Sequence, residues 1–276
     1  MRTKSSLVVV LAVALAAAGC GSSKSVKGPN DQSSSAKPPP AAKANKQLKA
    51  PSAPQTSSAT KSPGKRTIQA LSVEKAGKGK APQLKGLEGK SIEEKLTIFA
   101  QDIGSFWQNG FSEAQVQFEP ATTYLVSSPQ QIGCDPPGTV SPTDTPFYCA
   151  QDSSLSLPVE SLDRIDQNDN YGDAAVATIV GAFYGLHVEN VVGLLKGRPD
   201  RAVLETAVCL DGVWARSVYK RNLLDPGDLD KIGRTLSESE GEGGSSRTLV
   251  DAFNAGYSSG DPGKCVQDSG DPGMGG

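Results

Sequence analysis

The chain has 276 residues, of which 28 are Lys or Arg and 30 are Asp or Glu, giving a formal net charge of −2. This balance hides two regions of opposite charge: residues 21–90 carry 14 basic against 3 acidic side chains, and residues 91–276 carry 12 against 27. Only the acidic region is long and apolar enough for a sizeable core. We therefore expect no nucleic-acid partner for the folded part.

The first residues have the layout of a secretory signal peptide. Arg2 and Lys4 precede an uncharged apolar run over 7–18, which is shorter than the roughly 20 residues of a membrane-spanning helix. Small residues then lead to Cys20, as at the acylation site of a bacterial lipoprotein; an ordinary signal peptide with a chance cysteine is the alternative. We expect residues 1–19 to be removed and Cys20 to anchor the chain to the outer face of the cytoplasmic membrane, with a periplasmic membrane face as the alternative.

Two segments have the composition of disordered chain. Residues 20–90 are rich in Ser, Pro, Ala, Lys and Gly, which predicts a disordered basic linker. Its charges would be attracted to anionic lipid or to cell-wall polymers, although a purely solvated linker explains the same composition. The Gly-rich residues 267–276 predict a disordered tail, so the expected domain spans 91–266.

Periodicity within the domain predicts an α+β fold, mainly helical, with a small β-sheet. Ser91 and Glu94 form a capping box, and apolar residues then recur at helical spacing up to Gly110. Short strands are expected at 116–118, 122–126 and 155–157. Further helices are expected at 173–195, 200–220, 228–236 and 246–255, and the stretch 174–186 has no charged residue, which is typical of a buried central helix.

Two other patterns bear on ligands. Four cysteines follow Cys20, namely Cys134, Cys149, Cys209 and Cys265, and an even number in an exported chain predicts disulfides rather than a zinc site, since no Cys-x-x-Cys pair is present. Counting leaves their pairing open. The acidic run 163–173 offers oxygen ligands for weak calcium binding, but Tyr171 and Ala177 break the EF-hand pattern, and a polar loop is the simpler interpretation.

Several segments occur in a familiar order: Phe106-Trp107, Pro146 to Cys149, Gly172-Asp173, Cys209 with Gly212 to Ala215, and Phe253 to Pro262 followed by Cys265. They resemble the bacterial neutral zinc metallopeptidase family, a zincin group. The resemblance implies a zincin-like fold over about residues 91–266. It also implies that Cys134 pairs with Cys149 and Cys209 with Cys265.

The family's long helix reads His-Glu-x-x-His-His-x-Gln, in which two histidines hold zinc and the glutamate activates water. Aligned on His187, this chain has Ala182 and Leu186 at the two ligands and Phe183 at the catalytic glutamate. The family's third ligand comes from the next helix. Aligned on Cys209, Leu204 stands at that glutamate and Val208 at the following aspartate, while Glu205 lies one residue out of register.

The chain contains a single histidine, so it cannot supply a pair of histidine ligands. We therefore predict no zinc, no catalytic residue, and a non-catalytic binding or structural module. His187, Glu189 and Glu205 remain as candidate polar groups of a residual cleft, although a structural role explains His187 more simply. An active hydrolase using these groups is the alternative, and association with an active paralogue is a third hypothesis.

Overall fold

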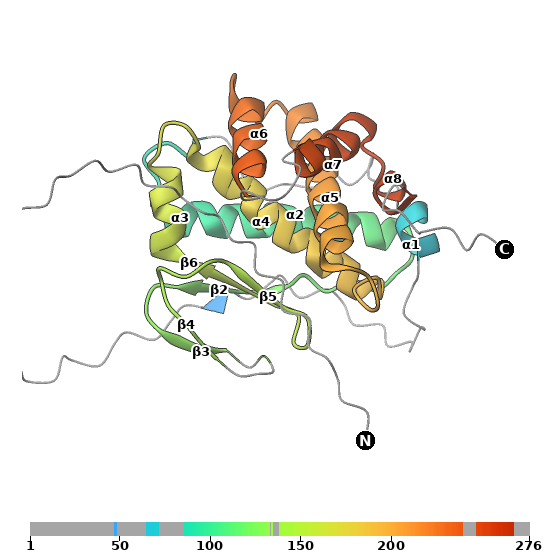
Figure 1. The fold of residues 1–276 in the computed structure, drawn as a ribbon, viewed down its shortest axis with the longest axis horizontal. Coiled ribbons are helices and arrows are strands. Elements are labelled where there is room, and N and C mark those ends of the chain that lie inside the picture. Colours follow the sequence, from blue (N-terminus) through green and yellow to red (C-terminus); the bar gives the residue numbers. More distant parts are fainter. Residues whose placement is uncertain are drawn as a thin grey trace, which may run out of the picture.

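A computed structural model describes residues 47–48, 65–71, 86–132, 134, 138–239 and 247–267. Its helices are α1 (Lys65–Ala70), α2 (Ile92–Glu113), α3 (Val159–Asp166), α4 (Gly172–Val191), α5 (Asp200–Lys220), α6 (Asp228–Glu238), α7 (Arg247–Ser259) and α8 (Pro262–Gln267). Its strands are β1 (Gln47–Leu48), β2 (Thr122–Val126), β3 (Gln130–Ile132), β4 (Gly138–Val140), β5 (Phe147–Cys149) and β6 (Ser154–Pro158). The helices pack together in one part of the molecule, and the strands gather along one side of them (Figure 1). The expected α+β, mainly helical class is confirmed.

The larger sheet has the strand order β1-β2-β6-β5. β2 runs parallel to β6, with Thr122 opposite Ser154, whereas β1 and β5 pair antiparallel with their neighbours. All five residues of β6 are buried, because this strand lies inside the sheet and against the helices. β3 and β4 form a separate antiparallel pair.

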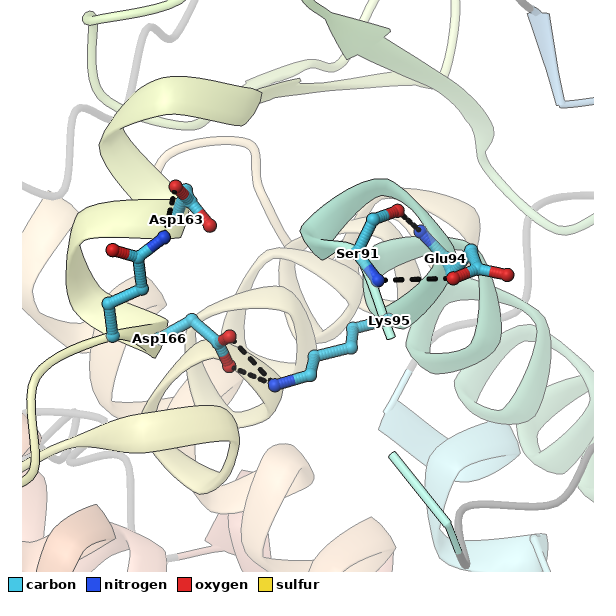
Figure 2. Close-up of polar contacts among 6 residues, drawn as sticks. Ser91, Glu94, Lys95, Asp163 and Asp166 are labelled. Carbon is cyan, nitrogen blue, oxygen red and sulfur yellow. Dashed lines mark hydrogen bonds and ion pairs between the residues drawn. The ribbon is translucent and has the colours of Figure 1, made fainter. Parts of the chain in front are cut away.

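The helix predicted from the capping box is α2. Ser91 Oγ accepts the Glu94 backbone N–H at 3.3 Å, and the Glu94 carboxylate accepts the Ser91 N–H at 3.1 Å (Figure 2). The next residue, Lys95, reaches across to Asp166 on α3, with Nζ 2.7 Å from Oδ2. The N-terminal turn of α2 is thereby capped and also joined to α3.

The expected central helix is α4, and it is buried along almost its whole length. Among the described residues it is the one helix that is long and apolar enough to cross a membrane, and 83% of its most apolar window is buried inside the protein. It ends at Val191, four residues before the predicted end, because Gly193 adopts a φ of 75° that a continuing helix does not allow.

One predicted strand is wrong. Residues 116–118 form no strand: the Val116 N–H bonds to Phe111 O at 2.9 Å, and Phe118 stacks on Phe111 with ring centroids 4.6 Å apart. The alternating pattern there reflects side chains folding back onto α2 rather than pairing with another strand. The other expected strands and helices are found, with ends displaced by a few residues.

The predicted domain boundary at residue 91 is also too late. Residues 65–71, assigned above to the disordered linker, form helix α1 and its end, and Ile68 and Leu71 are buried in the core. This helix packs on α8, where a Cβ added at Gly263 would lie 3.2 Å from Gln69 Cα. β1 also falls within the expected linker. Two apolar residues at i and i+3 are too short a signal to stand out in a Ser- and Lys-rich stretch.

The remaining terminal predictions, namely the signal peptide 1–19, acylated Cys20, most of the linker and the tail from 268, lie outside the described residues. Both disulfides implied by the resemblance are present. Cys134 and Cys149 have Cα atoms 5.8 Å apart, and those of Cys209 and Cys265 are 5.5 Å apart. The second bridge joins α5 to α8 across 56 residues of sequence.

Candidate functional site

The positions aligned above with the family's zinc site lie on α4 and α5, which pack closely and antiparallel. A Cβ added at Gly185 would lie 2.3 Å from Ala207 O, and one added at Gly181 would lie 1.8 Å from Asp211 Oδ1. Gly185 lets the α5 backbone approach α4, and Gly181, one turn earlier on α4, makes room for the Asp211 side chain. Gly185 therefore has a packing role that does not depend on a metal.

The predicted replacements are part of the hydrophobic core. Ala182, Phe183 and Leu186 on α4 are buried, as is Val208 on α5, and Leu204 is partly buried and packs against the same core. Phe183 is among the largest fully buried side chains of the described residues. The set thus contributes hydrocarbon contacts where the family motif would place nitrogen and oxygen donors.

His187 is buried, and both of its ring nitrogens are engaged. Nε2 lies 2.8 Å from Glu119 O, and because a carbonyl only accepts, Nε2 carries the proton. Nδ1 then accepts the Tyr148 hydroxyl at 2.9 Å, and that hydroxyl accepts the Asn190 amide N–H at 3.0 Å. Burial lowers the His187 pKa to about 4, so the ring is neutral and joins α4 to β5 and to the segment after α2.

Glu189 is also fully buried, and it faces a different partner. Its Oε2 lies 2.5 Å from Arg198 Nη1, while Nη2 of the same guanidinium donates to Thr206 Oγ1 at 2.7 Å and to Ala202 O at 2.9 Å. Oε1 has no hydrogen-bond partner. Burial raises the Glu189 pKa to about 8, against the opposing effect of Arg198. The pair ties the end of α4 to the start of α5.

Glu205 is engaged elsewhere. It forms an ion pair with Arg201 one turn earlier on α5, at 2.6 Å, and remains partly exposed. It lines a pocket of about 270 Å³ together with Asp251 and the Cys209–Cys265 disulfide. Glu189 and Glu205, two of the candidate groups for a residual cleft, are thus each engaged by a different arginine. His187, Glu189 and Glu205 therefore contact different groups, and these contacts do not join them into one cluster.

Asp211 and Asp102 are almost completely buried acids that the sequence pattern did not single out. Asp211 on α5 is completely buried, neither carboxylate oxygen has a partner, and burial raises its pKa well above the usual value. Asp102 on α2 accepts the Trp214 indole N–H at 2.8 Å and two Arg221 N–H groups at 2.6 and 2.8 Å. Both interrupt apolar helix faces, which is a visible signal, but the sequence does not reveal that one is paired and the other is not.

The acidic run proposed for calcium is partly occupied by protein contacts. Asp166 binds Lys95, and Asp163 accepts from the Gln167 amide at 2.7 Å. Asn168 Oδ1 accepts the Asn170 backbone N–H, closing a turn before α4. These contacts show that several oxygens of the acidic run already bind protein groups in the connection between α3 and α4.

Comparison with known proteins identifies the family. The sequence model of a family described as "Putative neutral zinc metallopeptidase" matches residues 64–267. The chain belongs to this family. The match begins beside α1, in agreement with the burial of that helix in the core.

Curated relatives in the family are distant. The chain is 23% identical over 190 residues to "Uncharacterized protein YpfJ" of Escherichia coli K12 and, to the same extent, to the protein of that name in E. coli O6:H1 strain CFT073. The alignment covers 58% of this chain and 65% of each relative, so the chain spans less than two thirds of their length. No solved structure matches the chain.

The residues present do not fit the zinc ion that the family's description implies. Ala182, Leu186 and Leu204 have no lone pair to offer a metal, and His187 beside them already uses both nitrogens. Within the described ranges, no group of three or more His, Cys, Asp or Glu side chains is placed to hold a metal ion. No catalytic step through zinc is therefore derived for this chain.

Proposed function

We propose that this protein is a non-catalytic member of the neutral zinc metallopeptidase family that acts as a binding or structural module. A lipid on Cys20 would hold it at the outer face of the cytoplasmic membrane. The metallopeptidase-like domain itself is established by the family match over residues 64–267. The loss of catalysis and the lipid anchor are the proposed parts.

One observation carries the proposal: the residues that the sequence alignment places at the family's ligand and catalytic positions are hydrophobic core. An unpaired polar group in such a core costs about 1 to 3 kcal/mol. Ala182, Phe183 and Leu186 avoid that cost, because their hydrocarbon side chains need no partner. A domain that no longer binds zinc gains stability from this substitution pattern, whereas an active peptidase loses its water-activating group.

The buried polar groups near these positions support the same interpretation. His187 is held neutral between Tyr148 and Glu119 O, and Glu189 is held by Arg198. Each connects two elements of the fold, as structural residues do. A general base needs a free lone pair directed at a substrate, and the single histidine spends its acceptor nitrogen on the Tyr148 hydroxyl.

Catalysis is tested with the full chain and fluorescently labelled casein, with and without added zinc and chelator. The proposal predicts cleavage no faster than in the blank, and no effect of Glu189→Gln or Glu205→Gln. Glu160→Gln on α3, an exposed residue, is the matched control. Chelator-sensitive cleavage that disappears in either test variant but persists in the control would refute the proposal and support an active hydrolase.

Anchoring is tested separately by metabolic labelling with palmitate. The native chain should incorporate label and sediment with membranes, whereas Cys20→Ala should be unlabelled and remain in the supernatant. Equal partitioning of the two chains would reject the lipid anchor without affecting the catalytic part of the proposal.

A further inference from the structure

A second region of the protein has the features of a ligand site. A pocket of about 330 Å³ opens where α4 begins and α5 ends, and its lining also includes residues of α2, α6 and the segment before α2. This volume lies in the range of small-molecule sites, about 300 to 1,000 Å³. Ala182, Leu186 and Leu204 are not part of its lining. The pocket is therefore separate from the family's metal positions.

The walls of the pocket are apolar and held in place. They include Phe99, Ala177, Trp214, Val218 and Ile232. The Trp214 indole N–H is already bound to Asp102, so the ring offers a ligand mainly carbon surface. Asp102 is in turn held by Arg221, which fixes the orientation of the ring before any ligand arrives.

All the charged side chains of the lining are acidic: Glu88, Asp173, Asp225 and Asp228. Lys231, outside the lining, has its Nζ 3.8 Å from Asp228 Oδ1. The lining itself carries four carboxylates and no basic side chain, so its own charge is negative. Burial raises the pKa of Asp228, whose Oδ2 accepts the Asp225 backbone N–H at 2.7 Å, and the charges of Asp173 and Asp225 raise this pKa further.

We propose that this pocket binds an organic cation, namely a protonated or quaternary amine attached to an apolar body. The apolar part would lie against Trp214 and Phe99, where burial removes hydrocarbon from water. The ammonium group would lie beside Asp173 and Asp225, whose negative charges attract it. An anion of the same shape is repelled, and a neutral analogue gains only the apolar contacts.

This inference goes beyond the proposed function and does not depend on the loss of zinc. The pocket lies at the start of α4 and the end of α5. The Glu189–Arg198 ion pair lies where α4 ends and α5 is about to begin. A chain that turned out to be an active peptidase would retain the same pocket, and a chain without zinc could leave it empty. The two claims can therefore fail independently.

The test uses isothermal titration of the full chain with three probes of equal length: 4-phenylbutylammonium, 4-phenylbutanol and 4-phenylbutyrate. The ammonium probe should bind most tightly, the alcohol more weakly, and the carboxylate without saturation. Raising the salt concentration should weaken only the ammonium probe, because salt screens charges. Equal affinity for the three probes, or no binding of any, overturns the proposal.

Variants locate the binding. Asp173→Asn combined with Asp225→Asn should weaken the ammonium probe between about 2-fold and 30-fold, as expected for two partly exposed ion pairs, and leave the alcohol unchanged. Asp230→Asn, an exposed residue on α6 outside the lining, is the matched control and should change neither. An unchanged ammonium affinity in the double variant contradicts the assignment. Should that variant fail to fold, the three-probe comparison on the unsubstituted chain still decides.

Discussion

The contact between Gly181 and Asp211 makes a sharp prediction about the α4–α5 interface. A Cβ at position 181 would lie 1.8 Å from Asp211 Oδ1 and 2.7 Å from its Cγ, and the carboxyl group is fully buried, so it has no solvent-exposed position to adopt. Gly181→Ala alone should therefore be destabilising: overpacking costs about 1 to 3 kcal/mol. The gain of about 1 kcal/mol from replacing a helical glycine only partly offsets this.

In a chain that already carries Asp211→Ala, the effect of Gly181→Ala on stability should change sign. Removing a buried carboxyl without partners should stabilise the fold by about 1 to 3 kcal/mol, less whatever the small cavity costs. The nearest remaining atom of residue 211, its Cβ, lies 3.4 Å from the added methyl group, at the edge of ordinary contact. In the Asp211→Ala background, Gly181→Ala should then stabilise by about 1 kcal/mol, which gives a coupling of about 1 to 3 kcal/mol.

Urea unfolding of the four chains measures this coupling, and pH provides a second readout. Because burial raises the Asp211 pKa, the folded state retains a proton that the unfolded state releases above about pH 4. Stability therefore falls as pH rises, and Asp211→Ala should stabilise more at pH 8 than at pH 5. Gly233→Ala, with nothing within 4 Å of the added methyl group, is the control and should have the same effect in both backgrounds. Additive effects of Gly181→Ala and Asp211→Ala would refute the reasoning.

Two further predictions concern neighbouring positions. Gly185→Ala should destabilise the fold by about 3 kcal/mol or more in thermal or urea unfolding, because the added Cβ meets the Ala207 backbone at 2.3 Å. The backbone cannot move aside as a side chain can. A loss of stability no larger than in Gly233→Ala would contradict this packing role. Glu189→Gln should flatten the fall in stability between pH 5 and pH 8, because the Glu189 pKa of about 8 in the folded state exceeds its ordinary value of 4.5 and the folded state keeps the proton. Parallel stability–pH curves for the two chains would show that Glu189 does not titrate in this way.

Local signals in the sequence were sufficient for the main elements. The capping box of Ser91 and Glu94 marks the start of α2, and the charge-free stretch 174–186 marks α4 as the buried centre. Both follow from short-range chemistry: a hydroxyl that accepts an N–H three residues on, and a helix without a polar face. The resemblance added the two cysteine pairings, which counting alone leaves open.

The partners that individual side chains contact in the folded protein could not be predicted from such local signals. Glu189 and Arg198 are joined by a turn whose geometry periodicity does not describe, and Glu205 prefers Arg201 on its own helix. Helix α1 depends on the distant α8 for its burial, so its own six residues carry little signal. Residues 116–118 alternate like a strand, yet Phe118 stacks on Phe111 instead. These partners depend on how turns, loops and neighbouring helices are arranged in three dimensions, which the periodicity of the sequence does not describe.

Metal analysis of the purified full chain tests the central claim most directly. After dialysis against buffer containing zinc and then against zinc-free buffer, mass spectrometry of the bound metal should find far less than one zinc per chain. The physical reason is that hydrocarbon at Ala182, Leu186 and Leu204 coordinates no cation. One zinc per chain that resists dialysis and is removed by a chelator would contradict the account.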